Sequence, residues 1–279
     1  MSAADFPTDY TAWMGRTEAS QDVLSHNLIK RIAATFAEPT PAVGQALPPL
    51  WQWCFFQDPE PESQLGEDGH PARGGFLPPA DNRNRMWAGG RVEFFEPLLV
   101  GAEAERVSTI VNIEEKHGRT GALLFVTVRH DYLHDGRLCV RDEQDIVYRE
   151  PNPPKLNSGE ATPAGDWSET ISPTPTLLFR YSAVTFNGHR IHYDYPYVTD
   201  TEGYAGLVVH GPMIATLSLR AFSRAHPDKR IRRFNYRGVR PLTVPTPFQV
   251  GGQLRDDSTA QLWAGNDAGI AQHGEVLFD

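Results

Sequence analysis

Apolar side chains follow a helical period near the start of the chain and an alternating period through much of the remainder. Residues 18–37 place apolar side chains three and four positions apart, which predicts a helix ending before Pro39. Residues 50–56 are rich in aromatics and predict a strand. Residues 57–85 are rich in Gly, Pro, Asp and Asn, which predicts a long loop of the kind that often carries function.

Strand-like runs occur in both halves of the chain, on either side of a segment rich in proline. The runs in the first half are 91–95, 104–116, 122–132 and 138–148. Those in the second half are 232–237, 248–254, 260–264 and 274–278. Residues 151–167 contain four prolines and show no periodicity, so they are predicted to form a linker.

The second half also contains a segment, 212–225, whose apolar side chains surround a helix almost completely, which is typical of a buried helix. The sequence Pro-Leu-x-Val occurs at 97–100 and again at 241–244, about half a chain length apart. This repeat favours an internal duplication. The predicted fold is α+β, with two antiparallel sheets, each wrapped around a helix. Residues 1–150 and 168–279 would be the two units, joined by the linker.

Composition excludes several classes of function for this chain of 279 residues. A net charge of −9 argues against nucleic acid as the main partner. The sequence has no apolar run long enough to span a membrane. Residues 1–9 lack the features of a signal or transit peptide, and Cys54 and Cys139 show no metal-ligand spacing. We therefore expect a cytoplasmic protein.

The densest chemistry lies in residues 179–194, where two histidines, an asparagine and an aspartate fall within eight positions. An apolar run ending in His210-Gly211-Pro212 follows, and it leads into the predicted buried helix. This arrangement suits acid/base chemistry beside an oxyanion. Two other interpretations stay open. His189 and His192 could form a metal pair with His210 or Asp194, or the segment could be a hydrogen-bonded structural turn.

Residues 179–194 and 207–216 resemble the (R)-specific enoyl-CoA hydratase family, which has the hotdog fold. The closer resemblance is to its double-hotdog branch of fungal mitochondrial 3-hydroxyacyl-thioester dehydratases and bacterial mesaconyl-C4-CoA hydratases. It rests on Ser-Ala-x-Thr-Phe-Asn-x-His-Arg-Ile-His-Tyr-Asp followed by Gly-Leu-Val-Val-His-Gly-Pro. The first half resembles this branch more loosely, through Trp13 and Leu47-Pro48-Pro49-Leu50-Trp51. The resemblance implies a pseudo-dimer of two hotdogs in one chain, of which the first is degenerate.

The broader family's motif reads Asp-x-Asn-Pro-Leu/Ile-His, and it places its histidine on His192, its aspartate on Asn187 and its asparagine on His189. An amide cannot accept a proton at working pH. The resemblance then implies that His192 is the general acid/base, with His189 as the alternative, and that Asn187 holds the water or hydroxyl.

The reaction implied is the reversible addition of water to an α,β-unsaturated acyl thioester. The Gly211 N–H, at the start of a helix that continues with Pro212, suits an oxyanion donor, a role that contributes about 3–4 kcal/mol. The branch points to a short, branched dicarboxylic acyl-CoA such as mesaconyl-C4-CoA. Alternatives are a fatty 3-hydroxyacyl-CoA or acyl-carrier-protein dehydratase, a thioesterase and a non-catalytic acyl-CoA-binding protein.

Substrate contacts are predicted for His189, Arg190 and His210. A basic cluster is a candidate site for the CoA phosphates, although such a cluster can equally be a solvated strand face. Its members are Lys229, Arg230, Arg232, Arg233, Arg237 and Arg240. No cofactor or metal is expected, and a homodimer is compatible with the fold. His70, His130 and His134 receive no role from the sequence.

Overall fold

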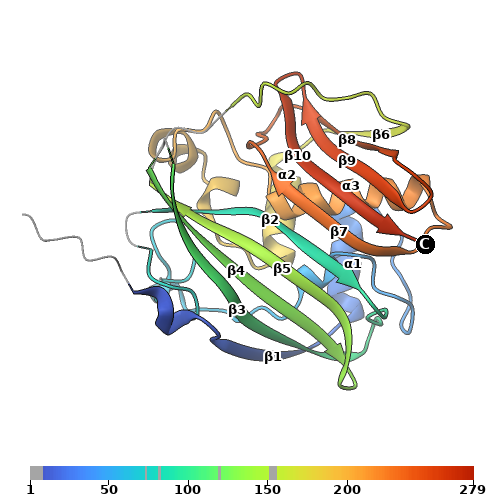
Figure 1. Cartoon of the computed structure of the whole chain (residues 1–279), viewed down its shortest axis with the longest axis horizontal. Helices are drawn as coiled ribbons and strands as arrows, with labels where there is room; N and C mark the ends of the chain where they lie inside the picture. The colour runs from blue at the N-terminus through green and yellow to red at the C-terminus, as the bar shows by residue number, and fades with distance from the viewer. Residues whose placement is uncertain (1–8, 73, 81–82, 119–120, 151–155) are drawn as a thin grey trace, which may run out of the picture.

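The computed structural model describes residues 9–72, 74–80, 83–118, 121–150 and 156–279. Its ten strands form one continuous antiparallel sheet, and the helices pack behind the sheet as drawn in Figure 1. The strands are β1 (Thr17–Val23), β2 (Asn84–Phe94), β3 (Glu103–Gly118), β4 (Gly121–His134), β5 (Arg137–Arg149), β6 (Trp167–Ile171), β7 (Ile231–Gly238), β8 (Phe248–Leu254), β9 (Thr259–Asn266) and β10 (Gly269–Phe278). The α-helices are α1 (His26–Phe36), α2 (Pro175–Val184) and α3 (Gly211–Ala225). Shorter helical turns are η1 (Tyr10–Trp13), η2 (Trp51–Cys54), η3 (Glu62–Gln64), η4 (Arg190–His192) and η5 (Tyr197–Thr201).

The strand order is symmetric about the middle of the sheet. It runs β1-β3-β4-β5-β2-β7-β10-β9-β8-β6, so each strand of the first half has a counterpart in the second. The halves meet where β2 pairs with β7, in the register that places Arg91 opposite Asn235. This arrangement confirms the predicted α+β double hotdog.

The repeated Pro-Leu-x-Val segments lie at equivalent places in the two halves. The N–H of Leu47 donates to the carbonyl of Leu98 at 2.7 Å, and the N–H of Val209 donates to that of Leu242 at 2.8 Å. This correspondence places η2 at the position of α3, and it places Pro49 at the position of Gly211.

The predicted helix over 18–37 is wrong in its first part. Thr17–Val23 forms β1, which pairs with β3 at the edge of the sheet, and only His26–Phe36 is helical. Ser25 caps α1 by accepting from the N–H of Leu28 at 3.4 Å. Val23 and Leu24 lie before the cap residue Ser25, so they are outside the helix. Their spacing matches that of the helix only by coincidence.

The predicted strand over 50–56 is also wrong. Trp51–Cys54 forms the 3₁₀ turn η2, and its Trp51 and Trp53 side chains are buried. The predicted helix at the centre of each sheet holds for the second half only. In the first half the corresponding place is held by η2, and α1 is the counterpart of α2.

The predicted buried helix over 212–225 is confirmed as α3. Its buried side chains include polar Thr216 and Ser218 besides the apolar ones, and it packs against β6 to β10. Burial on all sides explains why its sequence is apolar all round. The predicted long loop is largely confirmed, because η3 is the only regular element described between η2 and β2.

Parts of two other predictions fall outside the described residues, namely 1–8 of the N-terminal segment and 151–155 of the linker. The described linker residues 156–166 form no helix or strand, and β6 begins at Trp167. None of the described helices has the length and apolar character needed to cross a membrane.

Candidate active site

The histidine-rich segment is held between the end of α2 and the start of α3. Phe186 adopts a left-handed backbone conformation (φ 49°) that turns the chain out of α2. Asn187 stabilises the following turn, because its side-chain oxygen accepts from the N–H of His189 at 2.9 Å. The N–H of Val208 then donates to the carbonyl of Ile191 at 2.9 Å, which fixes the segment against the strand leading to α3.

His192 is buried, with 6% of its surface exposed, and its ring is fixed in one orientation. Its Nδ1 lies 2.7 Å from the carbonyl oxygen of Val208, which can only accept, so Nδ1 carries the proton and Nε2 the lone pair. Burial lowers the pKa of His192 to about 4, although the bond to Val208 opposes this effect. The imidazole is therefore neutral at physiological pH and able to accept a proton.

The ring of His210 stacks against the ring of His192. The two ring centroids are 3.5 Å apart, and His210 is completely buried. Its Nε2 lies 2.9 Å from the hydroxyl of Ser182. Burial, and then the charge of His192, lowers the pKa of His210 well below its usual value. His210 does not line the cavity, so the structure does not bring it to a substrate; it supports His192.

Gly211 begins α3 and lines the same cavity as His192. The first N–H groups of a helix have no partner within it, and the helix dipole favours negative charge there. The carbonyl of Gly211 accepts from the side-chain amide of Gln272 at 3.2 Å, which orients the peptide. A Cβ at Gly211 would lie 3.4 Å from the ring of Trp87, so glycine leaves room between the helix and this tryptophan.

The first half of the chain supplies the wall of the cavity opposite α3. Trp87 makes edge-to-face contacts with Trp53 and Tyr236, each with ring centroids 5.1 Å apart. The indole N–H of Trp53 donates to buried Asp142 at 2.7 Å. Burial raises the pKa of Asp142 to about 6 despite this bond. Val128, Tyr132 and Ile146 of β4 and β5 line the cavity, so the sheet face that a central helix would cover in this half forms part of the cavity wall.

The cavity has a volume of about 2110 Å³ and draws its lining from both halves. Asn187 and His189 line it together with His192 and Gly211. Burial, followed by the charges of His70 and His192, lowers the pKa of His189 to about 2, which keeps this imidazole neutral. The structure thus gathers these four predicted residues around one space.

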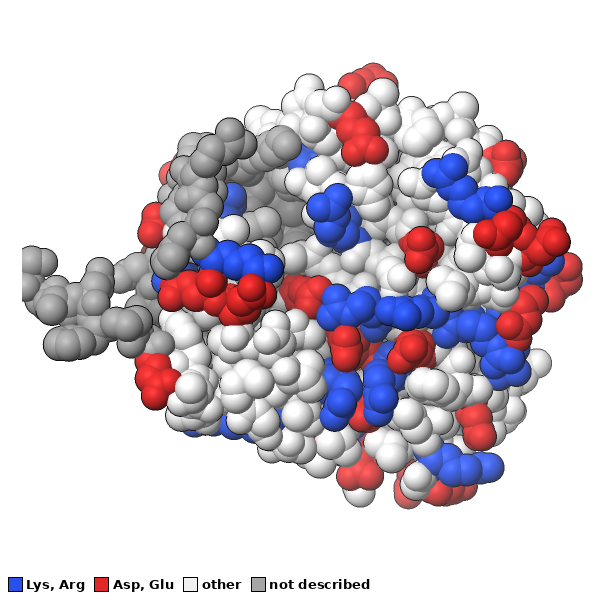
Figure 2. All heavy atoms as spheres, viewed as in Figure 1, with Lys and Arg blue, Asp and Glu red and all other residues white. Residues whose placement is uncertain are grey.

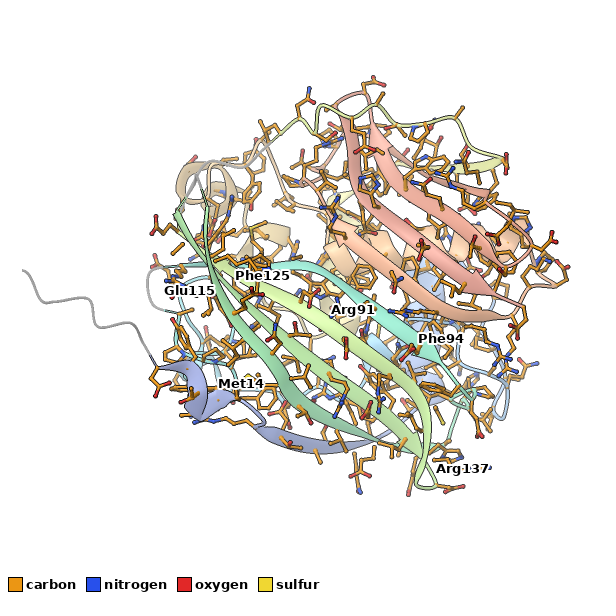
Figure 3. All side chains as sticks on the ribbon, in the orientation of Figure 1. Met14, Arg91, Phe94, Glu115, Phe125 and Arg137 are labelled. Atoms are coloured by element: carbon orange, nitrogen blue, oxygen red, sulfur yellow. The ribbon has the colours of Figure 1, made fainter. Side chains whose placement is uncertain are left out.

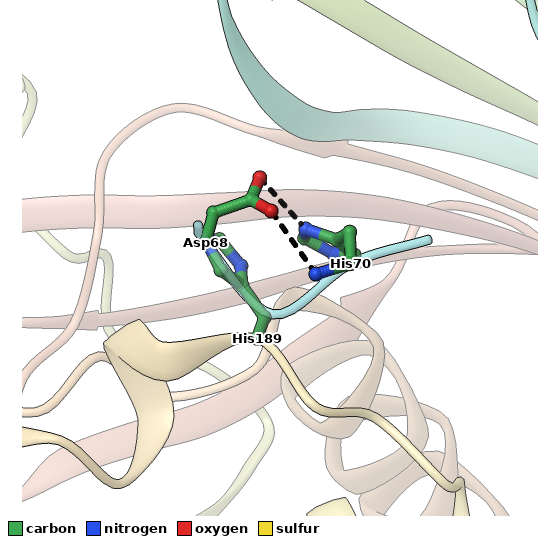
Figure 4. A group of neighbouring side chains, drawn as sticks. All are labelled: Asp68, His70 and His189. Atoms are coloured by element: carbon green, nitrogen blue, oxygen red, sulfur yellow. Dashed lines mark hydrogen bonds and ion pairs between the residues drawn. The ribbon is translucent and has the colours of Figure 1, made fainter. Parts of the chain in front are cut away.

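Two residues without a predicted role join them from the loop before β2. Asp68 and His70 lie beside His189, and the ring centroids of His70 and His189 are 4.2 Å apart (Figure 4). Both oxygens of Asp68 accept from His70, one from its N–H at 3.0 Å and the other from Nδ1 at 3.1 Å. Their proximity to the hydratase motif arises from folding, and the only signal in the sequence was a histidine in a loop rich in glycine.

Asp68, His70 and His189 are also the group of side chains in the described residues whose ligand atoms come close enough to hold a metal, all within 4.8 Å of one another. Both carboxylate oxygens of Asp68 already accept hydrogen bonds from His70, and these bonds account for the short distances within the group. The metal set considered from the sequence is not assembled among the described side chains. Asp194 pairs with Arg190 at 2.8 Å, and His210 bonds to Ser182.

The structure does not bring the predicted basic residues to the cavity wall, with Arg240 as the exception. Arg190 bonds to Asp194 and to the carbonyl of Glu67. Arg232 pairs with Asp279, and Arg233 donates to Asn235 at 2.9 Å. Arg237 is exposed on β7.

The central strands carry mixed charge on the face that Figure 2 presents, where basic and acidic side chains lie close together. Arg91, labelled on β2 in Figure 3, bonds to Glu143 at 3.0 Å and to Asp145 at 2.8 Å. Arg141 bonds to Asp131 at 2.7 Å in the same way. Such balanced pairs are typical of a solvated strand face.

Comparison with known proteins identifies relatives along almost the whole chain. The family model "Hydroxyacyl-thioester dehydratase type 2" matches residues 50–244. A mesaconyl-C(4)-CoA hydratase of Chloroflexus aurantiacus is 46% identical over 273 residues, covering 96% of this chain and 97% of that protein. A mitochondrial hydroxyacyl-thioester dehydratase type 2 of Schizosaccharomyces pombe is 28% identical, covering 82% of this chain and 88% of that protein.

Solved structures share the fold at low sequence identity. A MaoC-like dehydratase from Phytophthora capsici has a TM-score of 0.70 at 13% identity, covering 95% of this chain and 96% of its own. HtdX of Mycobacterium tuberculosis has a TM-score of 0.66 at 16% identity, covering 94% and 99%. The extent of the family match and the identity to the Chloroflexus protein settle the relationship: this chain belongs to the hydroxyacyl-thioester dehydratase type 2 family.

Proposed function

We propose that this protein is a hydro-lyase that adds water reversibly to mesaconyl-C4-CoA or a closely similar dicarboxylic enoyl-CoA. The observation that carries the proposal is the 46% identity to a mesaconyl-C(4)-CoA hydratase over 96% of the chain. The placement of His192 and Gly211 on one cavity supports it. That cavity, at about 2110 Å³, exceeds the size usual for drug-sized ligands and can admit an acyl group with part of its pantetheine arm.

In this proposal, neutral His192 removes a proton from the attacking water through Nε2. The side-chain oxygen of Asn187 is already bonded to the N–H of His189, which leaves its NH₂ group to hold the water oxygen. As the water oxygen bonds to the β-carbon, negative charge moves to the thioester oxygen, where the Gly211 N–H stabilises it. Protonation of the α-carbon completes the addition.

A dicarboxylic acyl group needs a cation near the reacting carbons, and five arginines line the cavity: Arg83, Arg85, Arg106, Arg149 and Arg240. Among these arginines, Arg85 is the one whose charge contributes to lowering the pKa of His189. We therefore assign Arg85 to the free carboxylate. The chain needs no cofactor in this scheme, and we place it in the cytoplasm, alone or as a homodimer.

The test is an absorbance assay of the purified protein with mesaconyl-C4-CoA, crotonyl-CoA and a long-chain enoyl-CoA. Wild type should turn over the first most efficiently, whereas His192→Ala should lower kcat by about 10²- to 10⁴-fold while leaving the fold intact. Arg85→Gln should raise KM for the dicarboxylic substrate alone. Free thiol released instead would indicate a thioesterase, and tight binding without turnover would indicate a non-catalytic protein.

The family match and the Schizosaccharomyces pombe relative favour a second candidate, a 3-hydroxyacyl-thioester dehydratase of the fatty-acid type. This function would need no cation at the acyl end of the cavity. A higher kcat/KM for the long-chain enoyl-CoA than for mesaconyl-C4-CoA, unaffected by Arg85→Gln, would support it over the first.

A further inference from the structure

The loop that carries Asp68 and His70 is a compact hairpin. Leu65 and Pro71 form an antiparallel bridge, and the N–H of Gly66 donates to the carbonyl of His70 at 2.7 Å. The N–H of Ala72 donates to the carbonyl of Gln64 at 2.8 Å and closes the base of the hairpin. Asp68 therefore lies at the tip of a hydrogen-bonded unit.

The tip of the hairpin contacts the hydratase motif of the other half. The N–H of Arg190 donates to the carbonyl of Asp68 at 2.9 Å, and its guanidinium donates to that of Glu67 at 3.0 Å. Gly69, at φ +85°, approaches Gly188 so closely that a Cβ on Gly69 would overlap the Gly188 carbonyl oxygen. Two glycines and two hydrogen bonds thus fix the hairpin in the active site.

This contact aligns three imidazoles along the cavity wall. The His70 and His189 centroids are 4.2 Å apart, and those of His189 and His192 are 5.4 Å apart. All three residues line the cavity. Among them, His70 has the carboxylate partner, because Asp68 accepts from both its N–H and its Nδ1 (Figure 4). Since Nδ1 is bonded to the carboxylate, a proton exchanged with a substrate would pass through Nε2.

Hydration needs two proton transfers, one from the water and one to the α-carbon. The broader family's motif offers a carboxylate for this work at the position where this chain has Asn187. Of the motif's carboxylate and histidine, this chain keeps the histidine as His192, and the rings of His192 and His189 are both neutral. A second group that holds a proton is therefore missing from the motif itself.

We propose that His70, oriented by its hydrogen bonds to Asp68, is the second acid/base residue, so that the first half of the chain replaces the carboxylate lost at Asn187. His192 accepts the proton of the water as its oxygen bonds to the β-carbon. The π electrons move toward the thioester oxygen, and Nε2–H of His70 then protonates the α-carbon. His192 releases the proton it gained and His70 regains one through solvent, which restores both groups.

The charges around the pair support this division of roles. Burial tends to raise the pKa of Asp68, but its hydrogen bonds to His70 and the charge of His70 lower it well below its usual value. A carboxylate that stays ionised favours the protonated form of the imidazole that it touches. Among the described residues, the neutral rings of His189 and His192 also lie near His70. Groups with opposed proton affinities in one site are the usual mark of an acid/base pair.

The inference rests on the proposed function, so its test begins with a substrate that wild type hydrates. His70→Asn should lower kcat at least 100-fold with little change in KM, and added imidazole should restore part of it to His70→Ala. Asp68→Asn keeps an oxygen for the His70 N–H but removes the charge, so kcat should fall about 10- to 100-fold. The alkaline limb of its pH profile should also move to lower pH. Asp228→Asn is the same substitution at an exposed position outside the cavity, and it should match wild type.

Solvent exchange at the α-carbon separates a catalytic role from a structural one. In deuterated water, wild type should incorporate deuterium at the α-carbon of the product-like 3-hydroxyacyl-CoA, and His70→Asn should lose this exchange while its melting temperature stays unchanged. Full activity in His70→Asn would overturn the inference and leave the proposed function intact. Loss of wild-type activity to a chelator, with recovery on adding Zn²⁺, would overturn it in favour of a metal on the same side chains. Absence of hydration by wild type would contradict the proposed function itself.

Discussion

The two halves of this protein share one strand arrangement, yet only the second builds a reactive helix start. Where α3 begins with His210-Gly211-Pro212, the corresponding place in the first half is Pro48-Pro49-Leu50, before the short turn η2. Proline has no N–H, so Pro49 cannot donate to an oxyanion. The chain between α1 and the Ala46–Leu99 bridge is also much shorter than that between α2 and the Val208–Thr243 bridge, which contains the motif. In the proposed mechanism, the second copy thus supplies the motif and the helix start, and the first supplies part of the cavity wall and the hairpin that carries His70.

The difference between Gly211 and Pro49 leads to the largest expected effect. Gly211→Pro removes the N–H and should lower kcat by about 10²- to 10³-fold, the usual loss for one oxyanion donor. The fold should tolerate it, because His210 already has an extended backbone (φ −60°, ψ 128°) that suits a residue before proline. Steady-state kinetics and a thermal melt would measure both effects.

Gly211→Ala is the matched control for that substitution, since it retains the N–H and adds a Cβ in contact with Trp87. Its kcat should stay within a few-fold of wild type. Equal losses of kcat in the two variants would show that position 211 needs glycine for the space beside Trp87, and that its N–H does not contribute to catalysis.

A smaller effect is expected from loosening the contact between the halves. Gly69→Ala forces a side chain onto a left-handed residue pressed against Gly188, a strain of about 1–3 kcal/mol. We expect kcat to fall about 10-fold as the hairpin withdraws from the motif. Gly75→Ala, in the same loop, places its Cβ in open space with no neighbouring atom within 4 Å and should behave as wild type. Similar kinetics for both variants would contradict the structural role given to the hairpin.

The smallest expected effect concerns the stability of the fold, and it comes from buried His192 in the second half. The folded state lowers the pKa of His192 to about 4, mainly through burial, whereas the unfolded chain takes up a proton near 6.5. Above pH 6.5 the imidazole is neutral in both states, so the stability contribution is complete there. As the pH falls from 6.5 toward 4, the unfolded chain binds a proton that the folded protein does not, and the free energy of unfolding decreases. The slope attributable to this one group is at most about 1.4 kcal/mol per pH unit.

Urea denaturation of wild type and His192→Gln between about pH 4 and 7 would measure this contribution. The variant should lose less stability per pH unit on acidification. Parallel curves would mean that His192 contributes nothing to the pH dependence of folding.

Several features of the fold could be read from local pattern. Alternation predicted most strands, and an all-apolar helix predicted α3, because burial on both or all sides leaves a periodic signature. The first strand was missed because Val23 and Leu24 continue the spacing of the helix behind them. The turn η2 was missed because a run of buried aromatics is equally compatible with a strand and with an irregular buried segment.

The residues of the active site also fall into two groups, those predicted from the sequence and those found only in the structure. Sequence alone determined that His192, Asn187, His189 and Gly211 belong together, because they lie in one short stretch with a recognisable order. Only the tertiary structure decided that His210 supports and does not line the cavity, that the arginines of β7 lie outside it, and that Asp68 and His70 reach the motif. Those outcomes depend on contacts between residues far apart in the chain, such as Gly69 against Gly188, and no local pattern encodes which loop folds across which motif.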